Sequence, residues 1–424
     1  MIYPPRQTMP VPRLIRKNTI YIAIVLALQG LGGQLAVTLG ALMVVQLLGK
    51  ATLAGVGGSI LSAGRILMPY PMGKLTDIYG RKPGMVISLA CSLIGGFLLG
   101  ASITISSFPV FLAGMIILGL GIGSARQLNV AAVDMYPSTR RGEGLGYVLT
   151  GSIASAFISP LIVVIGETVG RVTGKDPLGI SWYLMLLVLL PTVFFILLIK
   201  PDPRSIALSL RKYWPSYDPP PSINGTTPPA AISTFLRHRP KQITYACYAA
   251  AQGTMSLMMV MTSLVMAEGG HPIRSISIAV SIHVLGMFAF SIPFGKLADS
   301  IGRKPLLGVG LLIEAFGAFL VPVTQSYTII TLALFFIGIG WSAVNIAGTS
   351  LLADTTLPEE RGRAIGLNET LSGILSIGMP LLGGFVVDVS GLTMMGIIGG
   401  SVAMIPLIFL PHLKEVKRGH YIYE

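Results

Sequence analysis

The sequence GKLTDIYGRKP, residues 73–83, returns in the second half of the chain as GKLADSIGRKP, residues 295–305. Each copy follows one long apolar segment and precedes another. A charged, glycine-rich loop that repeats at half-chain spacing between apolar segments is typical of a duplicated helical membrane bundle. We therefore take the two loops as landmarks and place the rest of the chain around them.

The composition is that of a membrane protein. Of the 424 residues, 52% are hydrophobic and only 11% are charged, whereas soluble domains carry roughly 25% charged residues. Several apolar runs reach the ~20 residues that a helix needs to cross a bilayer, and backbone groups in lipid must pair internally. The net charge of +13 comes from basic residues scattered between these runs. We therefore expect the lipid bilayer, and no nucleic acid, as the partner.

The apolar runs predict an all-α membrane protein with twelve transmembrane helices in two pseudo-symmetric six-helix bundles. The bundles are residues 1–199 and residues 243–424, the second with a short tail. Residues 200–242 hold nine prolines and predict a linker, with a short surface helix near residues 206–213. The expected spans are residues 19–47, 52–72, 84–104, 108–131, 145–166, 180–199, 243–266, 275–294, 306–322, 328–352, 364–387 and 392–411.

The basic residues predict the orientation. With the N-terminus in the cytoplasm, the cytoplasmic segments contain 24 of the 30 Lys and Arg residues, as the positive-inside rule requires. Both termini and the linker are thus expected inside. The short outer loops favour a bacterial inner membrane.

A second motif is also duplicated. The stretch from Asp134 through Arg141 to Gly146 matches the stretch from Asp354 through Arg361 to Gly366, at a constant separation of 220 residues. Together with the two loops, it resembles the major facilitator superfamily, in which the loops join helices two and three and helices eight and nine. The resemblance covers nearly the whole chain. It implies a transporter and not an enzyme, with no cofactor and no metal.

The resemblance also implies a network that clamps the two bundles in one state and releases them in another. Arg81 and Arg303 would pair with Asp134 and Asp354. The remaining members would be glycines of the tight loops and charged residues at facing helix ends. Their list is Gly73, Asp77, Gly80, Arg141, Gly295, Asp299, Gly302, Arg361 and Arg363.

Polar residues inside the spans are costly and are therefore candidates for function. His283 titrates near neutral pH, so it is a candidate for proton coupling, or else a hydrogen-bonded packing residue. Glu369 either carries a proton or pairs with a neighbouring arginine. Glu314 lies on an outer helix, where packing is favoured. The remaining candidates for substrate or proton binding are Gln29, Gln34, Arg65, Arg126, Gln252, Trp341 and Asn345.

The motifs are closest to the proton-coupled drug exporters of the superfamily, chiefly through the loops and through Pro380, Gly383 and Gly384 of helix eleven. Met115 departs from that branch, which carries an arginine at this place. We expect a monomer that exports amphipathic small molecules by proton antiport. A proton-coupled importer of an anionic metabolite is the alternative, motivated by Arg65, Arg126 and His283. A non-transporting receptor on the same fold is a further alternative.

Overall fold

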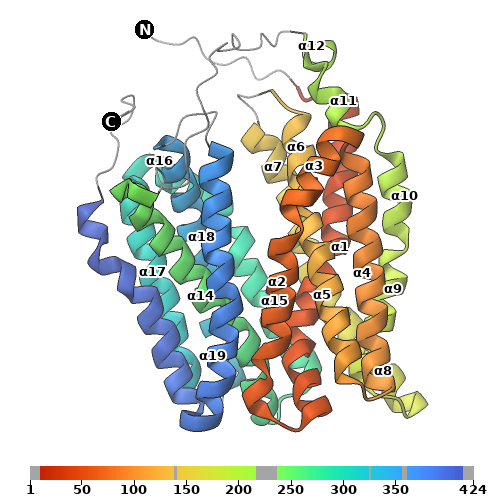
Figure 1. The fold of residues 1–424 in the computed structure, drawn as a ribbon, viewed down its shortest axis with the longest axis vertical. Coiled ribbons are helices and arrows are strands. Elements are labelled where there is room, and N and C mark those ends of the chain that lie inside the picture. The colour runs from red at the N-terminus through yellow and green to blue at the C-terminus, as the bar shows by residue number, and fades with distance from the viewer. Residues whose placement is uncertain (1–9, 138–140, 216–235, 324–325, 356–360, 414–424) are drawn as a thin grey trace.

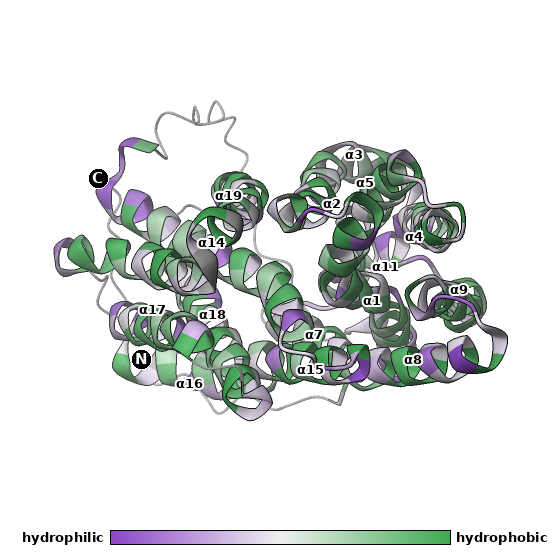
Figure 2. Ribbon diagram, turned by 90° about the horizontal axis from the view of Figure 1, so that it is seen from below, coloured by the Kyte–Doolittle hydropathy of each residue, from purple (hydrophilic) through white to green (hydrophobic). Residues whose placement is uncertain are grey.

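The protein is described by a computed structural model that covers residues 10–137, 141–215, 236–323, 326–355 and 361–413. Within these residues the secondary structure is helical, with no β-strand. Two groups of helices lie side by side, the N-terminal half in red to yellow and the C-terminal half in green to blue (Figure 1). Apolar residues dominate the ribbons of both groups (Figure 2).

The N-terminal half contains ten α-helices and one 3₁₀-helix among the described residues. They are α1 (Arg13–Leu48), η1 (Ala51–Leu53), α2 (Gly55–Leu67), α3 (Pro69–Tyr79), α4 (Arg81–Thr104), α5 (Phe108–Ser124), α6 (Arg126–Asp134), α7 (Arg141–Leu149), α8 (Gly151–Thr173), α9 (Pro177–Leu189) and α10 (Pro191–Leu198).

The linker begins with two short helices, α11 (Pro203–Ala207) and α12 (Leu210–Tyr213), where one was expected. The C-terminal half follows with α14 (Arg239–Glu268), α15 (Ile273–Ala289), α16 (Ser291–Ile301), α17 (Arg303–Leu320), η3 (Val321–Val323), α18 (Tyr327–Asp354), α19 (Arg361–Met404), η4 (Ile405–Ile408) and η5 (Leu410–His412).

Eleven segments of the described chain are long and apolar enough to cross a membrane. The expected second span corresponds to the shorter apolar stretch Ala51–Leu67, because the helix breaks at Met68 and resumes at Pro69 as α3. Proline has no N–H to donate and crowds the preceding turn, so such a break is expected. The α9–α10 break before Pro191 has the same cause.

The turn between the last two spans lies within the bounds of α19. α19 contains 44 residues, which as one straight helix would measure about 66 Å, twice the thickness of a bilayer core. It contains the span Leu367–Val387 and the start of the span Thr393–His412, which continues through η4 and η5. Figure 1 shows the blue ribbon descending and then rising again, so the chain reverses between them.

The two halves pack together through α1, α2 and α8 on one side and α14, α15 and α19 on the other. The Ser59 hydroxyl donates to the Ile377 carbonyl at 2.6 Å, and the Ser263 hydroxyl donates to the Val37 carbonyl at 2.9 Å. These contacts lie toward the end opposite the two repeated loops, because α2 begins there and α3 carries the first loop. The halves are thus closed on each other at that end.

Candidate functional site

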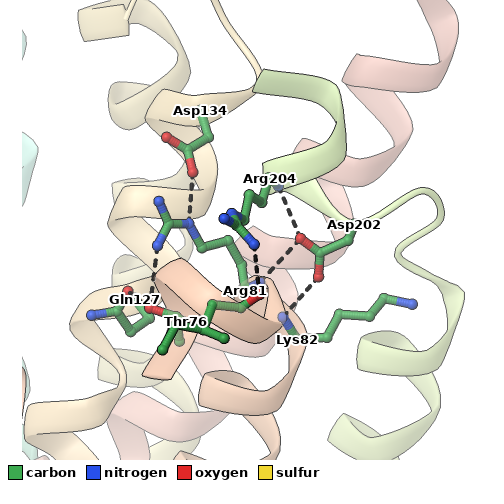
Figure 3. A network of polar contacts seen from close by, with 8 residues as sticks. Thr76, Arg81, Lys82, Gln127, Asp134, Asp202 and Arg204 are labelled. Carbon is green, nitrogen blue, oxygen red and sulfur yellow. Dashed lines mark hydrogen bonds and ion pairs between the residues drawn. The ribbon is translucent and has the colours of Figure 1, made fainter. Parts of the chain in front are cut away.

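The first repeated loop is held by the end of helix α6. α3 ends at Tyr79, the following Gly80 has a φ of +95°, a conformation that favours glycine, and α4 begins at Arg81. The Arg81 Nε forms an ion pair with Asp134 Oδ2 at 2.7 Å, the pair that the sequence predicts. The Arg81 Nη1 also donates to Thr76 Oγ1 at 3.2 Å, and Thr76 donates to Gln127 Oε1 at 2.9 Å (Figure 3). We call these four side chains the hairpin network.

The linker adds a second anchor to the same loop. Asp202 accepts hydrogen bonds from the backbone N–H groups of Arg81 and Lys82, each at 3.0 Å, and from that of Arg204 at 2.9 Å (Figure 3). The carboxylate therefore caps two helices, α4 and α11, at their positive ends. The Arg204 Nη1 donates back to the Ile78 carbonyl at 2.6 Å. Sequence reasoning missed this anchor, although an Asp followed by Pro is a common start of a helix.

The second repeated loop has the same backbone but different partners. Gly302 has a φ of +101° and α17 begins at Arg303. The Arg303 Nη1 donates to the Ala298 carbonyl at 3.0 Å, and the Lys304 Nζ donates to the Pro411 carbonyl at 2.9 Å. The first loop is thus fastened to the linker and the second to the C-terminal end of the last span.

The structure describes the backbone but not the side chain of several predicted members of the gating network. Their backbones are helical: α7 begins at Arg141 and α19 at Arg361, while Gly73 and Gly295 lie inside α3 and α16. The pairing of Arg303 with Asp354 therefore stays a prediction, and so do the pairings of the other undescribed side chains. The undescribed side chains of the network are Asp77, Arg141, Asp299, Asp354, Arg361 and Arg363; that of the substrate candidate Arg126 is also undescribed.

Four predicted substrate candidates converge in the C-terminal half. The Trp341 indole N–H donates to Gln252 Oε1 at 2.9 Å. The Tyr248 hydroxyl donates to Asn345 Oδ1 at 2.8 Å, and its oxygen lies 3.4 Å from Glu369 Oε1. We call these five residues, from α14, α18 and α19, the polar cluster. All except Tyr248 are partly exposed. Tyr248 was not predicted, because a tyrosine in an apolar helix is more often a packing residue.

The predicted glutamines of α1 do not join this cluster. Gln29 is buried and accepts from the Ser88 hydroxyl at 2.8 Å. Gln34 is also buried and donates to Ser155 Oγ at 2.7 Å. They tie α1 to α4 and α8, so their contacts are those of packing residues within the N-terminal half. Arg65 is exposed in the last turn of α2.

His283 also lies apart from the cluster. Its side chain is fully buried between α15 and α18, and its Nδ1 lies 2.7 Å from the Leu334 carbonyl. The Nδ1 therefore carries a proton and donates it. The backbone thus satisfies Nδ1, as the packing alternative expects, while the buried Nε2 has no hydrogen-bond partner among the described residues.

Comparison with known proteins identifies the chain. The model of the Major Facilitator Superfamily matches residues 20–271 and 243–420, almost the whole sequence. The chain belongs to the Major Facilitator Superfamily. It is therefore a multi-pass membrane transporter of a small molecule and not an enzyme.

Three relatives illustrate the match. An uncharacterized MFS-type transporter of Bacillus subtilis, YddS, is 24% identical over 393 residues, 89% of this chain and 86% of the relative. The riboflavin transporter RfnT of Brucella anthropi is 25% identical over 358 residues, 84% of this chain and 85% of the relative. The crystal structure of a bacterial homolog of the human lysosomal transporter Spinster, inward-facing and occupied, has the same fold, with a TM-score of 0.67, 13% identity and coverage of 93% and 96%.

Exporters of the superfamily carry an arginine at a position where this chain has a buried packing residue, Met115. Met115 is fully buried on α5, and its terminal methyl lies 3.3 Å from where a Cβ on Gly40 of α1 or on Gly57 of α2 would stand. An arginine in this place would bring an unpaired charge among apolar helices. In this superfamily member, α5 offers no cationic group there.

The superfamily member has two grooves at the end that carries the repeated loops. One, of about 570 Å³, lies between α1 and α8 and includes Thr19, Tyr136 and Gly151. The other, of about 460 Å³, lies between α14 and α19 and includes Tyr245 and Leu371. Nearer the opposite end, α8 packs on α15 and α19 packs on α2. Each groove therefore lies along a helix, α8 or α19, that packs against the opposite half farther along its length. Among the described residues, no group of His, Cys, Asp and Glu is arranged to hold a metal.

Proposed function

We propose that the chain is a proton-coupled secondary transporter that moves a small amphipathic aromatic compound by alternating access. The polar cluster carries this proposal. It offers a partly exposed indole ring beside amide, hydroxyl and carboxyl groups, and a ring with a few placed polar groups suits a planar, polar-edged ligand. A single chain contains both halves, so the transport unit is a monomer.

Alternating access is supported by the uneven packing of the halves. The hydrogen bonds from Ser59 and Ser263 close one end, and at the outer limit of that end Glu167 accepts from the Arg274 backbone N–H at 3.0 Å. The basic residues place the loop end in the cytoplasm. The conformation is then inward-facing, in the inner membrane of a bacterium, with both termini inside.

Riboflavin is a specific candidate within this class. One relative that matches most of the chain is named a riboflavin transporter. The isoalloxazine ring of riboflavin is planar and has hydrogen-bonding groups along one edge, which Gln252 and Asn345 would complement while Trp341 stacks on the ring. Efflux of other amphipathic aromatics is the broader form of the proposal, and it follows from the exporter-like loops.

The experiment is proton flux in proteoliposomes that contain a pH-sensitive dye, with riboflavin, ethidium and benzoate as test compounds. Collapse of an imposed pH gradient by riboflavin or ethidium, with proton movement opposite to the compound, is expected for the proposed antiport. Co-transport of benzoate that is lost in Arg126→Ala would instead favour the anion importer. Binding of a compound without flux would favour a receptor.

A further inference from the structure

Glu314 is a buried acid that the polar cluster does not include. It lies in the middle of the span Arg303–Val323, and its side chain is 0% exposed. Ionisable groups inside a membrane span are rare because they are costly, and they mark ion or proton sites more often than packing. The expected packing role would require a partner that satisfies the carboxyl.

The carboxyl points into a tight junction of three helices. A Cβ on Gly340 of α18 would lie 2.7 Å from the Glu314 Cβ, so the two helices approach closely here. A Cβ on Gly310, one turn before Glu314, would lie 2.9 Å from the Gly340 carbonyl. On the third helix, α14, the backbone of Met255 faces the carboxyl. The group is therefore enclosed by α14, α17 and α18.

Within the described residues, no hydrogen bond of normal geometry reaches either oxygen of Glu314. The nearest ionisable groups on α14, Cys247 and Tyr248, are two turns or about 10 Å before Met255. The others on the helices packed against α17 lie toward the ends of α14 and α18, in α16, α19 and η5, or, for Glu369, beside Tyr248. Those others are Arg239, Lys241, Tyr245, Glu268, Lys296, Asp299, Tyr327, Asp354, Arg361, Arg363, Asp388 and His412.

Among the described residues, an ionised carboxylate in this junction would have no cationic partner and no hydrogen bond of normal geometry, with the Met255 backbone turned toward it. Such a charge is far more costly than a neutral acid in the same place. The enclosure therefore favours the protonated form in this conformation. Any movement that opens the junction to water or to a donor would favour release of the proton.

The junction shares its walls with the polar cluster. Gln252 lies one turn before Met255 on α14, and Trp341 follows Gly340 directly on α18. These two residues are joined by the indole hydrogen bond. A ligand that takes over the Gln252 or Trp341 hydrogen bond would thus act on the same backbone segments that enclose Glu314.

We propose that Glu314 is a proton-binding site of the transporter, occupied in this conformation and emptied when α14 and α18 move apart. The proposal rests on the proposed transport function for its role in coupling, but the proton site itself is a separate property. It places the proton behind the polar cluster, and not on His283.

The test reads the proton directly, by infrared spectroscopy of the full-length protein in liposomes during a pH titration. Wild type is expected to show the carbonyl stretch of a protonated carboxyl at neutral pH, which disappears as the pH rises. Glu314→Gln should lose that signal, whereas Glu268→Gln, at the exposed end of α14, should retain it. A wild-type protein without the signal, or an unchanged signal in Glu314→Gln, would overturn the proposal.

A second variant separates proton binding from structure. Glu314→Leu has a similar volume and no polar atom, so it should fold with an unfolding temperature equal to or above that of wild type, and it should lose the signal. A large loss of stability would show that the carboxyl is structural and would count against the site. If a test compound moves protons while Glu314→Gln changes neither signal nor coupling, the transport function stands and this site does not. If Glu314→Gln loses the signal but no compound is transported, the proton site stands and the proposed transport function does not.

Discussion

The Trp341 indole N–H and the Gln252 side-chain carbonyl are joined at 2.9 Å, and this bond connects α18 to α14. Both side chains are partly exposed, so the bond is not sealed inside the packed C-terminal half. It fixes the plane of the indole ring. We expect ligand affinity to depend both on the ring and on its orientation.

Trp341→Phe tests this orientation. The variant retains an aromatic ring but loses the donor to Gln252, a hydrogen bond with a net value of about 1 kcal/mol, or roughly five-fold in KM. Trp341→Ala should cost more because the ring is lost as well. The measurement is KM for the transported compound, with Trp182→Phe, a buried residue of α9, as the control. An equal KM in wild type and both Trp341 variants would remove the ring from the site.

Tyr248→Phe tests the second part of the polar cluster. The hydroxyl has one proton, which is donated to Asn345, while Glu369 lies 3.4 Å from the same oxygen. Its removal leaves the Asn345 carbonyl without this donor, at a cost of about 1–3 kcal/mol if no water replaces it. We expect a higher KM, and a Tyr248→Phe, Glu369→Gln double-mutant cycle should show non-additive effects. Additive effects would mean that the two groups act independently.

Much of the fold could be predicted from the sequence, because span length and apolar composition are local properties. The two repeated loops located the halves, and the Arg81–Asp134 pair followed from the duplicated motif. The break at Met68 and the helical turn that joins the last two spans within α19 were not expected. Proline makes the first a local effect, but the second depends on how the turn between the last two spans packs.

The candidate site was only partly predictable for a related reason. A polar residue inside a span signals that it needs a partner, but not which helix provides it. Gln252 and Trp341 were both predicted as candidates, and the structure joins them by a hydrogen bond, while their role in binding stays a prediction. His283 carried an equal signal and instead bonds to the Leu334 backbone, a partner that has no sequence signature. Asp202 was missed because its second contact, with α4, is more than one hundred residues away.

Asp202→Ala should destabilise the first loop and slow transport. The carboxylate caps α4 and α11, and loss of a helix cap costs about 0.5–2 kcal/mol. We expect a lower unfolding temperature and a lower kcat, because the loop and the linker lose their shared anchor. Asp176→Ala is the matched control: Asp176 also precedes a proline and caps one helix, α9, at the opposite end. Similar transport losses in both variants would show that only general stability is involved.

Gly384→Ala should weaken the closed end. A Cβ on Gly384 would overlap the Thr52 carbonyl, where α19 meets the segment before α2, and a backbone atom cannot move aside as a flexible side chain can. Gly378→Ala on the same helix is the control, since a Cβ there meets nothing within 4 Å. Both replacements favour helix by a similar amount, so only the overlap differs. We expect Gly384→Ala to shift the population away from the conformation described here and to reduce the transport rate.

Spin labels at the exposed Lys50 and Ser390, in a background without Cys91 and Cys247, would report the separation of the two segments. We expect a longer distance in Gly384→Ala than in Gly378→Ala, because the packing of the halves leaves no space for a methyl group at residue 384. Identical distances and transport rates in the two variants would show that this contact does not hold the end closed.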